Sequence, residues 1–321
     1  MTSISKPGLV SVIVASYNHA EFLEERIDSL INQTYKNIEI IVIDDCSKDG
    51  SLNVLRKYET QPKFNLIVRK KNAGWASVSN QGAKIAKGEY IIFANCDDSC
   101  ESTMIEKLVE SMDKNPSAGI SFCRSKIVDE KGNILGDDYL ARDDRFKNKC
   151  QNDVFIPKKE MTIFLLHSCV IPNLSAALFS KKCFEKSGGF TKDYKVCGDW
   201  DFYFRAIKQF DVAYIAMPLN KFRQHETTIR SNTENKDMYA EFFKLLLTQL
   251  SMSKLDHISR IKLRIRVIEL LIRYISLNPI IALKGINSHL ELIVKLDFIT
   301  LLFIPFSFLS IGKTILTKKW K

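Results

Sequence analysis

The sequence lacks the glycine patterns that mark two common classes of nucleotide-binding enzyme. Among its 13 glycines, none forms a GxGxxG motif after the first apolar stretch, and no GxxxxGK[ST] loop occurs anywhere. The first motif holds dinucleotides and the second holds nucleoside triphosphates, each through backbone N–H groups that approach the phosphates closely. We therefore disfavour a nicotinamide-linked dehydrogenase and a P-loop NTPase.

Neither the cysteines nor the N-terminus points to secretion. The eight cysteines include no pair of CxxC motifs, and Cys96 and Cys100 alone stand four residues apart. The segment from Met1 to Gly8 has no apolar core of the kind that secretory signal peptides carry. We expect free thiols and a cytoplasmic protein.

No apolar run is long enough to predict a transmembrane helix. The best candidate, Phe298 to Ile311, is shorter than the roughly 20 residues that span a bilayer, and Pro305 interrupts it. Its apolar residues, with a basic end at Lys318 to Lys321, suit an anionic membrane interface. We expect peripheral attachment to the cytoplasmic face of a membrane. A helical subdomain packed on the core, or a homodimer interface, is the alternative.

The net charge of +10 predicts an anionic partner, but it does not distinguish nucleotide phosphates from a membrane surface or nucleic acid. No nucleic-acid-binding module is recognisable, so we do not expect nucleic acid as a partner. The 321 residues can form one substantial core with an appendage, or two modest domains. The composition changes after about Thr233, where helical patterns cover Phe242–Leu250 and Ile258–Leu277.

Strands and helices alternate through the first part of the chain. Such regular alternation predicts a mainly parallel sheet with right-handed crossovers. The predicted strands are Leu9–Ala15, Ile38–Ile43, Phe64–Val68 and Tyr90–Ala94, and the helices are Glu21–Gln33, Ser51–Tyr58 and a third that ends near Ala86.

The following region is less regular. We predict strands at Gly119–Val128, Val212–Ala216 and Lys221–His225. The segment 136–152 is highly polar and has no clear period, so we expect a mobile loop there, or a surface that meets a variable partner.

Polar residues follow each of the first four predicted strands. They are Ser16 to Asn18, Asp44 and Asp45, Asn72, and Asn95 to Asp98. Parallel strands end at one edge of a sheet, and ligands bind at that edge in open α/β folds. The sequence therefore predicts that these side chains line a single crevice.

Two acidic positions stand out as candidates for chemistry. Asp97 and Asp98 repel each other unless a cation or hydrogen-bond donors neutralise them, and Mg²⁺ and Mn²⁺ prefer oxygen ligands. The alternative is a helix N-cap, because Asp98 precedes a predicted helix at Thr103–Met112. Asp199 and Asp201 lie beside apolar residues, where a carboxylate can become a general base, or can cap a helix. His225 is either a metal ligand, a phosphate contact or a surface histidine.

Taken in order, these residues resemble family 2 glycosyltransferases of the GT-A fold. The resemblance covers roughly the first 230 residues, and the ordered set is specific although each motif alone is weak. The motifs are Val10–Asn18, Gln33-Thr34, Glu39–Asp49, Asn72–Gly74, Lys87–Phe93 with Asp97-Asp98, Gly188–Phe190, Gly198–Asp201 and Arg223–His225.

The resemblance implies a Rossmann-like α/β catalytic domain at 1–232, with a helical C-terminal region at 233–321. It further implies a nucleotide-sugar site formed by Ser16, Tyr17, Asn18, Asp45, Asn72 and Asp97. Asp97 and His225 match positions that bind Mn²⁺ or Mg²⁺ or the donor diphosphate, and Asp199 matches the catalytic base. The implied reaction is inverting, with a UDP-sugar as the most probable donor.

Three departures qualify the resemblance. Asn95 replaces the first acid of the DxD motif, so a metal would meet one charge fewer, although Asn95 still offers a carbonyl oxygen. Ser79-Asn80 replaces an arginine–asparagine pair, so one nucleotide contact is either missing or supplied by Lys70, Lys71 or Lys84.

The QxxRW motif of processive synthases is also absent, which favours transfer of one sugar per event. We expect a saccharide or lipid-linked saccharide acceptor, in surface polysaccharide synthesis. An inactive nucleotide-binding relative and a sugar nucleotidyltransferase are the alternatives.

Overall fold

The computed structural model describes residues 6–171, 173–228, 231–252, 255–277, 291, 293–294 and 298–303. The chain divides into two compact units. The N-terminal unit comprises residues 1–192 and 198–225, and the C-terminal unit comprises residues 193–197 and 226–321. That residues 1–232 carry catalysis, and that residues 233–321 carry membrane or dimer contacts, stays a prediction.

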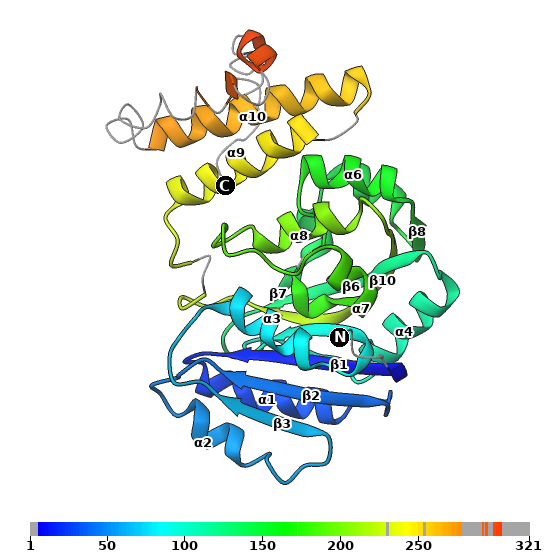
Figure 1. The fold of residues 1–321 in the computed structure, drawn as a ribbon, viewed down its shortest axis with the longest axis vertical. Helices are drawn as coiled ribbons and strands as arrows, with labels where there is room; N and C mark the ends of the chain where they lie inside the picture. The colour runs from blue at the N-terminus through cyan, green and yellow to red at the C-terminus, as the bar shows by residue number, and fades with distance from the viewer. Residues whose placement is uncertain are drawn as a thin grey trace. The chain divides into compact units, whose positions relative to one another are not determined.

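The first four strands of the N-terminal unit are parallel. β1 (Lys6–Ser16) pairs with β2 (Ile38–Asp44) on one side and with β4 (Gly88–Asn95) on the other, and β2 pairs with β3 (Phe64–Val68). Figure 1 shows β1, β2 and β3 side by side. The connecting helices are α1 (Ala20–Ile31), α2 (Ser51–Arg56) and α3 (Trp75–Ile85). The predicted alternation is confirmed.

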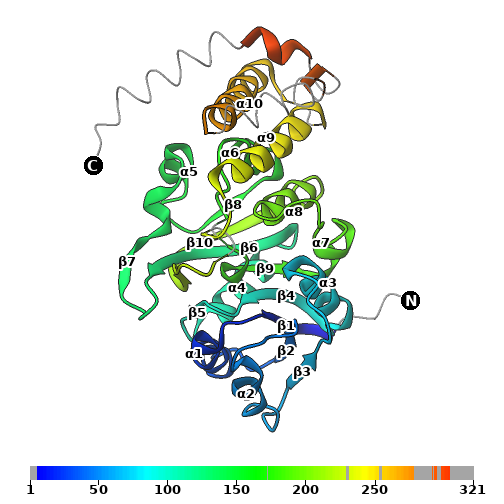
Figure 2. The ribbon, with the colours of Figure 1, turned by 90° about the vertical axis from the view of Figure 1, so that its left-hand side faces the viewer.

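β1 reads as a continuous apolar run because both of its faces are buried. Val10, Val12 and Val14 share one hydrophobic core with Leu23 and Ile27 of α1. Ile13 faces the other side, where α3 approaches so closely that a Cβ at Gly82 would lie 2.4 Å from an Ile13 methyl. Helices α1 and α3 therefore cover opposite faces of this strand (Figure 2).

The sheet continues from β4 through one reversed strand. β9 (Ala177–Ser180) is antiparallel to both β4 and β6 (Ala118–Val128), and β10 (Asp211–Arg223) is parallel to β6. Two successive reversals return β6 and β10 to the direction of β4, so the long strands run the same way. The sheet also includes β5 (Ser99–Cys100), β7 (Ile134–Asp137) and β8 (Val154–Ile156).

β10 corrects the prediction of two separate strands at 212–216 and 221–225. It is one strand whose pairing with β6 shifts register on either side of Pro218. Proline has no N–H for a ladder bond, so it reads in the sequence as an interruption, whereas the sheet accommodates it at an irregularity.

The remaining helices of the N-terminal unit surround this half of the sheet. They are α4 (Met104–Lys114), α5 (Asp144–Lys149), α6 (Lys158–His167), α7 (Lys181–Lys186) and α8 (Gly198–Ala206), with short 3-10 turns η1 (Asp138–Ala141) and η2 (Leu174–Ala176).

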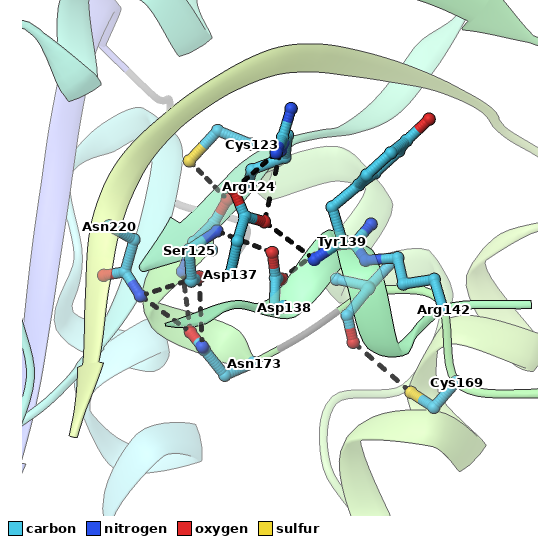
Figure 3. Close-up of polar contacts among 12 residues, drawn as sticks. Cys123, Arg124, Ser125, Asp137, Asp138, Tyr139, Arg142, Cys169, Asn173 and Asn220 are labelled. Carbon is cyan, nitrogen blue, oxygen red and sulfur yellow. Dashed lines mark hydrogen bonds and ion pairs between the residues drawn. The ribbon is translucent and has the colours of Figure 1, made fainter. Parts of the chain in front are cut away.

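The expectation of a loop without regular structure at 136–152 is wrong. The segment contains the end of β7, then η1 and α5, and a buried ion pair fixes it. Asp138 accepts a hydrogen bond from the Ser125 backbone at 2.9 Å and pairs with Arg142, whose guanidinium lies 5.1 Å from the Phe146 ring centroid. Figure 3 shows this cluster beside Asn173 and Asn220. A polar sequence therefore encodes an internal network here.

The C-terminal unit is built on two helices, α9 (Asn235–Met252) and α10 (His257–Leu277). Their buried residues, such as Leu246 and Leu250 on α9 and Leu263 and Val267 on α10, recur at helical spacing. Among the described residues, no helix has both the length and the apolar character needed to cross a bilayer. Only η3 (Phe298–Phe303) of the predicted membrane-interface segment lies within the described residues, and 304–321 lies outside them.

Candidate functional site

The predicted polar strand ends meet at one edge of the sheet. Ser16 pairs in register with Asp44, and Ala15 pairs with Asn95. The Asp45 backbone N–H donates to the Ser16 carbonyl at 2.8 Å, which joins the loops that leave β1 and β2. The chain therefore brings its candidate nucleotide- and metal-binding segments together at the carboxyl ends of parallel strands.

Three side chains at this edge form a cluster with the composition of a metal site. The potential ligand atoms of His19, Asp97 and His225 all lie within 4.8 Å of one another. An Asp97 carboxylate oxygen lies 3.0 Å from His225 Nε2, and the His19 and His225 rings are 5.3 Å apart. Asp97 follows β4 and His225 follows β10, so the structure joins the two ligands that the family resemblance implied.

His19 was not among the candidate metal ligands predicted from the sequence. Its Nδ1 lies 2.8 Å from the Tyr17 carbonyl oxygen, which fixes the ring orientation. Its Nε2 is buried and has no hydrogen-bond partner among the described residues. A buried imidazole nitrogen without a partner, next to a carboxylate and a second imidazole, fits a divalent cation. The only signal in the sequence was a histidine in the loop after the first strand.

The pKa values of the two aspartates in the acidic turn shift in opposite directions. Burial opposes ionisation of Asp97, but the hydrogen bond from His225 and the charges of His19 and His225 hold the pKa of this carboxyl below its usual value. Burial and the neighbouring Asp97 carboxylate raise the pKa of Asp98 to about 7. Asp97 is thus the better metal ligand of the two.

Asp98 holds the turn together and does not cap a helix. Its carboxylate accepts a hydrogen bond from the Arg223 backbone N–H at 3.0 Å, and Asn95 Nδ2 lies 3.3 Å from its other oxygen. Helix α4 instead begins after Thr103, which makes no side-chain cap. The N-cap interpretation of Asp98 is therefore wrong. Whether Asn95 also binds a metal stays a prediction.

Two buried arginines fix the backbone of the acidic turn. Arg223 Nε donates to the Asp97 carbonyl at 2.8 Å, and its terminal nitrogens reach the carbonyls of Asp129 and Glu130 and the carboxylate of Glu25. Arg26 Nε donates to the Asn95 carbonyl at 2.8 Å. The sequence analysis missed Arg26, although an arginine within the apolar stripe of α1 was a usable signal.

The predicted nucleoside-binding residues divide into buried and exposed groups. Ser16 is buried, and its hydroxyl has no hydrogen-bond partner in the part of the chain that the structure describes. Asp45 accepts hydrogen bonds from the Ala73 and Gly74 backbones at 2.9 Å. Tyr17 is 41% exposed. Asn18 Oδ1 accepts a hydrogen bond from the Lys48 backbone at 2.7 Å, and Asn72 is exposed. The buried residues shape the loops, and their contacts with a nucleotide stay a prediction.

Asn80 of α3 has a structural role. Its side-chain amide exchanges two hydrogen bonds with the Phe190 backbone, at 2.8 and 2.9 Å. The preceding glycines, Gly188 and Gly189, have positive φ angles of 79° and 65°, which few other residues adopt. The Gly-Gly-Phe motif is therefore a turn anchored to α3.

The candidate base lies in the first turn of α8. Asp199 is half-buried, and its carboxylate accepts a hydrogen bond from the Trp200 backbone at 2.7 Å. Asp201 forms an ion pair with Arg205 at 2.8 Å on the same helix. Both carboxylates lie in the first turn of α8, and Asp199 is the one that the family resemblance implies as the base.

Comparison with known proteins identifies a family and relatives of this chain. The model of Glycosyl transferase family 2 matches residues 11–186. An uncharacterized glycosyltransferase of Rickettsia typhi is 30% identical over 247 residues, which cover 75% of this chain and 73% of the relative.

Two solved structures share the fold. Residues 1–349 of TarS from S. aureus, in complex with UDP-GlcNAc, superpose with a TM-score of 0.63 at 19% identity, covering 84% of this chain and 73% of TarS. The mannosyltransferase PcManGT from Pyrobaculum calidifontis, in complex with GDP-Man and Mn²⁺, superposes with a TM-score of 0.53 at 18% identity. The match covers 97% of this chain and 88% of the PcManGT chain. At these identities the likeness shows the fold alone, and it confirms the expected GT-A architecture.

Proposed function

This chain belongs to glycosyl transferase family 2, and on that premise we propose that it transfers one sugar from a UDP-sugar to an acceptor hydroxyl with inversion of the anomeric centre. The observation that carries the proposal is the cluster of His19, Asp97 and His225 at the carboxyl edge of the sheet. The UDP-GlcNAc bound by TarS supports a uridine nucleotide, and the GDP-Man bound by PcManGT is the competing precedent.

His19, Asp97 and His225 would hold the divalent cation. Two imidazole nitrogens favour Mn²⁺ over Mg²⁺, because Mg²⁺ takes oxygen ligands almost exclusively. When bound, the cation neutralises charge on the leaving diphosphate. The orphaned Nε2 of His19 supports this assignment because an occupied site would satisfy it. Asn95 contributes less, since its amide nitrogen is directed to Asp98.

The nucleoside is assigned to the loops that leave β1, β2 and β3. Tyr17 and Asn72 are exposed there, while Ser16, Asn18 and Asp45 shape the same surface. We assign Asp45 a structural role, because its carboxylate already accepts hydrogen bonds from the backbone N–H groups of Ala73 and Gly74. We therefore expect direct contacts from Tyr17 and Asn72, and an indirect effect from Asp45.

Asp199 is assigned the role of general base. The acceptor oxygen attacks the anomeric carbon as the carbon–oxygen bond to the diphosphate breaks. Asp199 takes the hydroxyl proton, and the nucleoside diphosphate leaves with the bonding electrons.

The acceptor and the location extend this proposal. We assign a saccharide or lipid-linked saccharide acceptor, in surface polysaccharide synthesis, and a peripheral position on the cytoplasmic face of a membrane. The net charge of +10 supports contact with anionic lipid, and the C-terminal region is the proposed element for this contact or for a homodimer. No observation favours the sugar nucleotidyltransferase alternative.

Thermal unfolding with UDP, GDP, dTDP and CMP, each with and without Mn²⁺, tests the donor assignment. A ligand at about a hundred times its dissociation constant adds roughly 2.7 kcal/mol, which is readily measured. We expect a Mn²⁺-dependent shift with UDP, and loss of that shift in Asp97→Asn. The control Asp144→Asn changes a carboxylate that is 87% exposed and should keep the shift. An equal shift with and without the metal would reject the metal site, and a GDP-only shift would reject the uridine donor.

A further inference from the structure

Glu241 of α9 binds the segment that leads into the helix of the candidate base. Its Oε1 accepts a hydrogen bond from the Lys195 N–H at 2.7 Å. Its Oε2 accepts hydrogen bonds from the N–H groups of Val196 and Cys197 at 2.8 and 3.1 Å. One carboxylate thus binds three consecutive backbone donors, all within the C-terminal unit. Hydrogen bonds to an ionised acceptor are the strong class.

The bound segment has no regular structure of its own. Residues 195–197 form bends between an irregular stretch and the start of α8 at Gly198, so they do not belong to a strand or helix whose own backbone ladder would satisfy their donors. Cys197 is 1% exposed, where an unsatisfied backbone group would be costly. A second contact comes from the same helix, where Lys244 Nζ lies 5.4 Å from the centroid of the Tyr194 ring. Helix α9 therefore fixes this segment at two points.

We propose that Glu241 is a positioning residue for transfer, which fixes the chain that enters α8 and thereby orients Asp199. The proposal rests on the role assigned to Asp199 under the proposed function. Asp199 follows Cys197 by two residues, so a rotation of the backbone at Cys197 or Gly198 displaces its carboxylate. A displacement of about 1 Å at a reacting group can cost on the order of a hundredfold in rate.

The variants Glu241→Gln and Glu241→Ala test this role. An amide keeps one acceptor oxygen but turns an NH₂ group towards a backbone N–H, and alanine removes both acceptors. We expect kcat to fall about tenfold in Glu241→Gln and about a hundredfold in Glu241→Ala, while the affinity for UDP with Mn²⁺ stays unchanged. Glu234→Gln, at an exposed position just before α9, is the matched control and should keep the full kcat.

A double-mutant cycle separates positioning from general destabilisation. If Glu241 acts only through Asp199, adding Glu241→Ala to Asp199→Asn should leave the residual rate unchanged. A further tenfold loss in that background would overturn the proposal, as would parallel loss of UDP affinity. If Glu241→Ala fails to fold, Glu241→Gln in the same cycle decides the question.

The two proposals fail in distinguishable ways. Full activity in Asp199→Asn would reject the base assignment itself, whatever Glu241 does. An inactive Asp199→Asn together with a fully active and folded Glu241→Ala would reject only the positioning role.

Discussion

The two parts of the proposed site, the acidic turn at Asp97 and the segment before Asp199, are held in place by different kinds of contact. The acidic turn at Asp97 follows a central strand, and two buried arginines hold its backbone carbonyls. The segment before Asp199 lacks regular structure, and one carboxylate satisfies its backbone donors. The proposed metal-binding part is therefore held by the sheet and by two buried arginines. The segment before the proposed base is held by a side chain of α9, so we expect a substitution at Glu241 to disturb this segment without unfolding the protein.

The largest expected effect comes from removing the base itself. Asp199→Asn keeps the size of the side chain but cannot accept a proton at neutral pH. We expect kcat to fall by about 10²- to 10⁴-fold, the usual contribution of general base catalysis. UDP binding with Mn²⁺, measured by calorimetry, should stay unchanged. Asp201→Asn is the matched control on the same helix. Loss of kcat in this variant, with full activity in Asp199→Asn, would mean that the two roles are exchanged.

Removing a buried arginine should damage stability more than chemistry. Arg223→Met removes a hydrogen-bond donor from the carbonyls of Asp97, Asp129 and Glu130. Breaking a buried charged network costs about 3 kcal/mol or more, which urea unfolding can measure. Arg56→Met, at an exposed position on α2, should change stability by less than about 0.5 kcal/mol. Equal urea midpoints for Arg223→Met and Arg56→Met would show that the hydrogen bonds of Arg223 do not stabilise the acidic turn.

The proposed contribution of His19 to Mn²⁺ binding can be separated from those of Asp97 and His225. His19→Gln removes an imidazole from the cluster, so we expect the apparent Mn²⁺ affinity to fall about tenfold, near the lower end of effects seen at metal sites. A Mn²⁺ titration of UDP binding measures this change. His257→Gln, at the exposed start of α10, provides the control. Unchanged Mn²⁺ affinity in His19→Gln would leave Asp97 and His225 as the protein ligands.

The smallest expected effect concerns the replaced acid of the DxD motif. Asn95→Asp restores the family residue but exchanges an N–H donor 3.3 Å from Asp98 for a second carboxylate. We expect a loss of about 1 kcal/mol in unfolding free energy without metal, because a buried acceptor loses its donor. Thermal melts in the presence of a chelator give the value. A more stable Asn95→Asp variant would show that the amide does not support Asp98.

The sequence predicted β1, β2 and β4 closely because both faces of each strand are largely buried, which produces apolar runs such as Tyr90–Ala94. β3, at the edge of the sheet, was predicted as well, although its residues are only partly buried or exposed. Prediction from the sequence failed where long-range contacts decide the structure. Because of Pro218, the sequence predicted two short strands where pairing with β6 forms one. The polar composition of 136–152 gave no sign that Asp138 and Arg142 form a buried ion pair. Local patterns cannot reveal partners that are distant in the chain.

The same distinction applies to the site. Asp97 and His225 could be found because their motifs are recognisable in order, and the structure places them 3.0 Å apart. His19 and Arg26 carry no motif. Their importance comes from tertiary neighbours, such as the Asn95 carbonyl that Arg26 reaches across 69 positions of sequence. The roles of Asp199, Tyr17 and Asn72 stay predictions, since they depend on ligands.

The C-terminal unit is discontinuous in sequence, since residues 193–197 belong to it although the chain on both sides of them belongs to the N-terminal unit. A chain cut after residue 232 would retain these five residues but lose Glu241, their partner. Exchange of C-terminal regions between family members therefore has to transplant both pieces together. Recombination at the apparent linker alone would produce hybrids that bind the donor and transfer poorly.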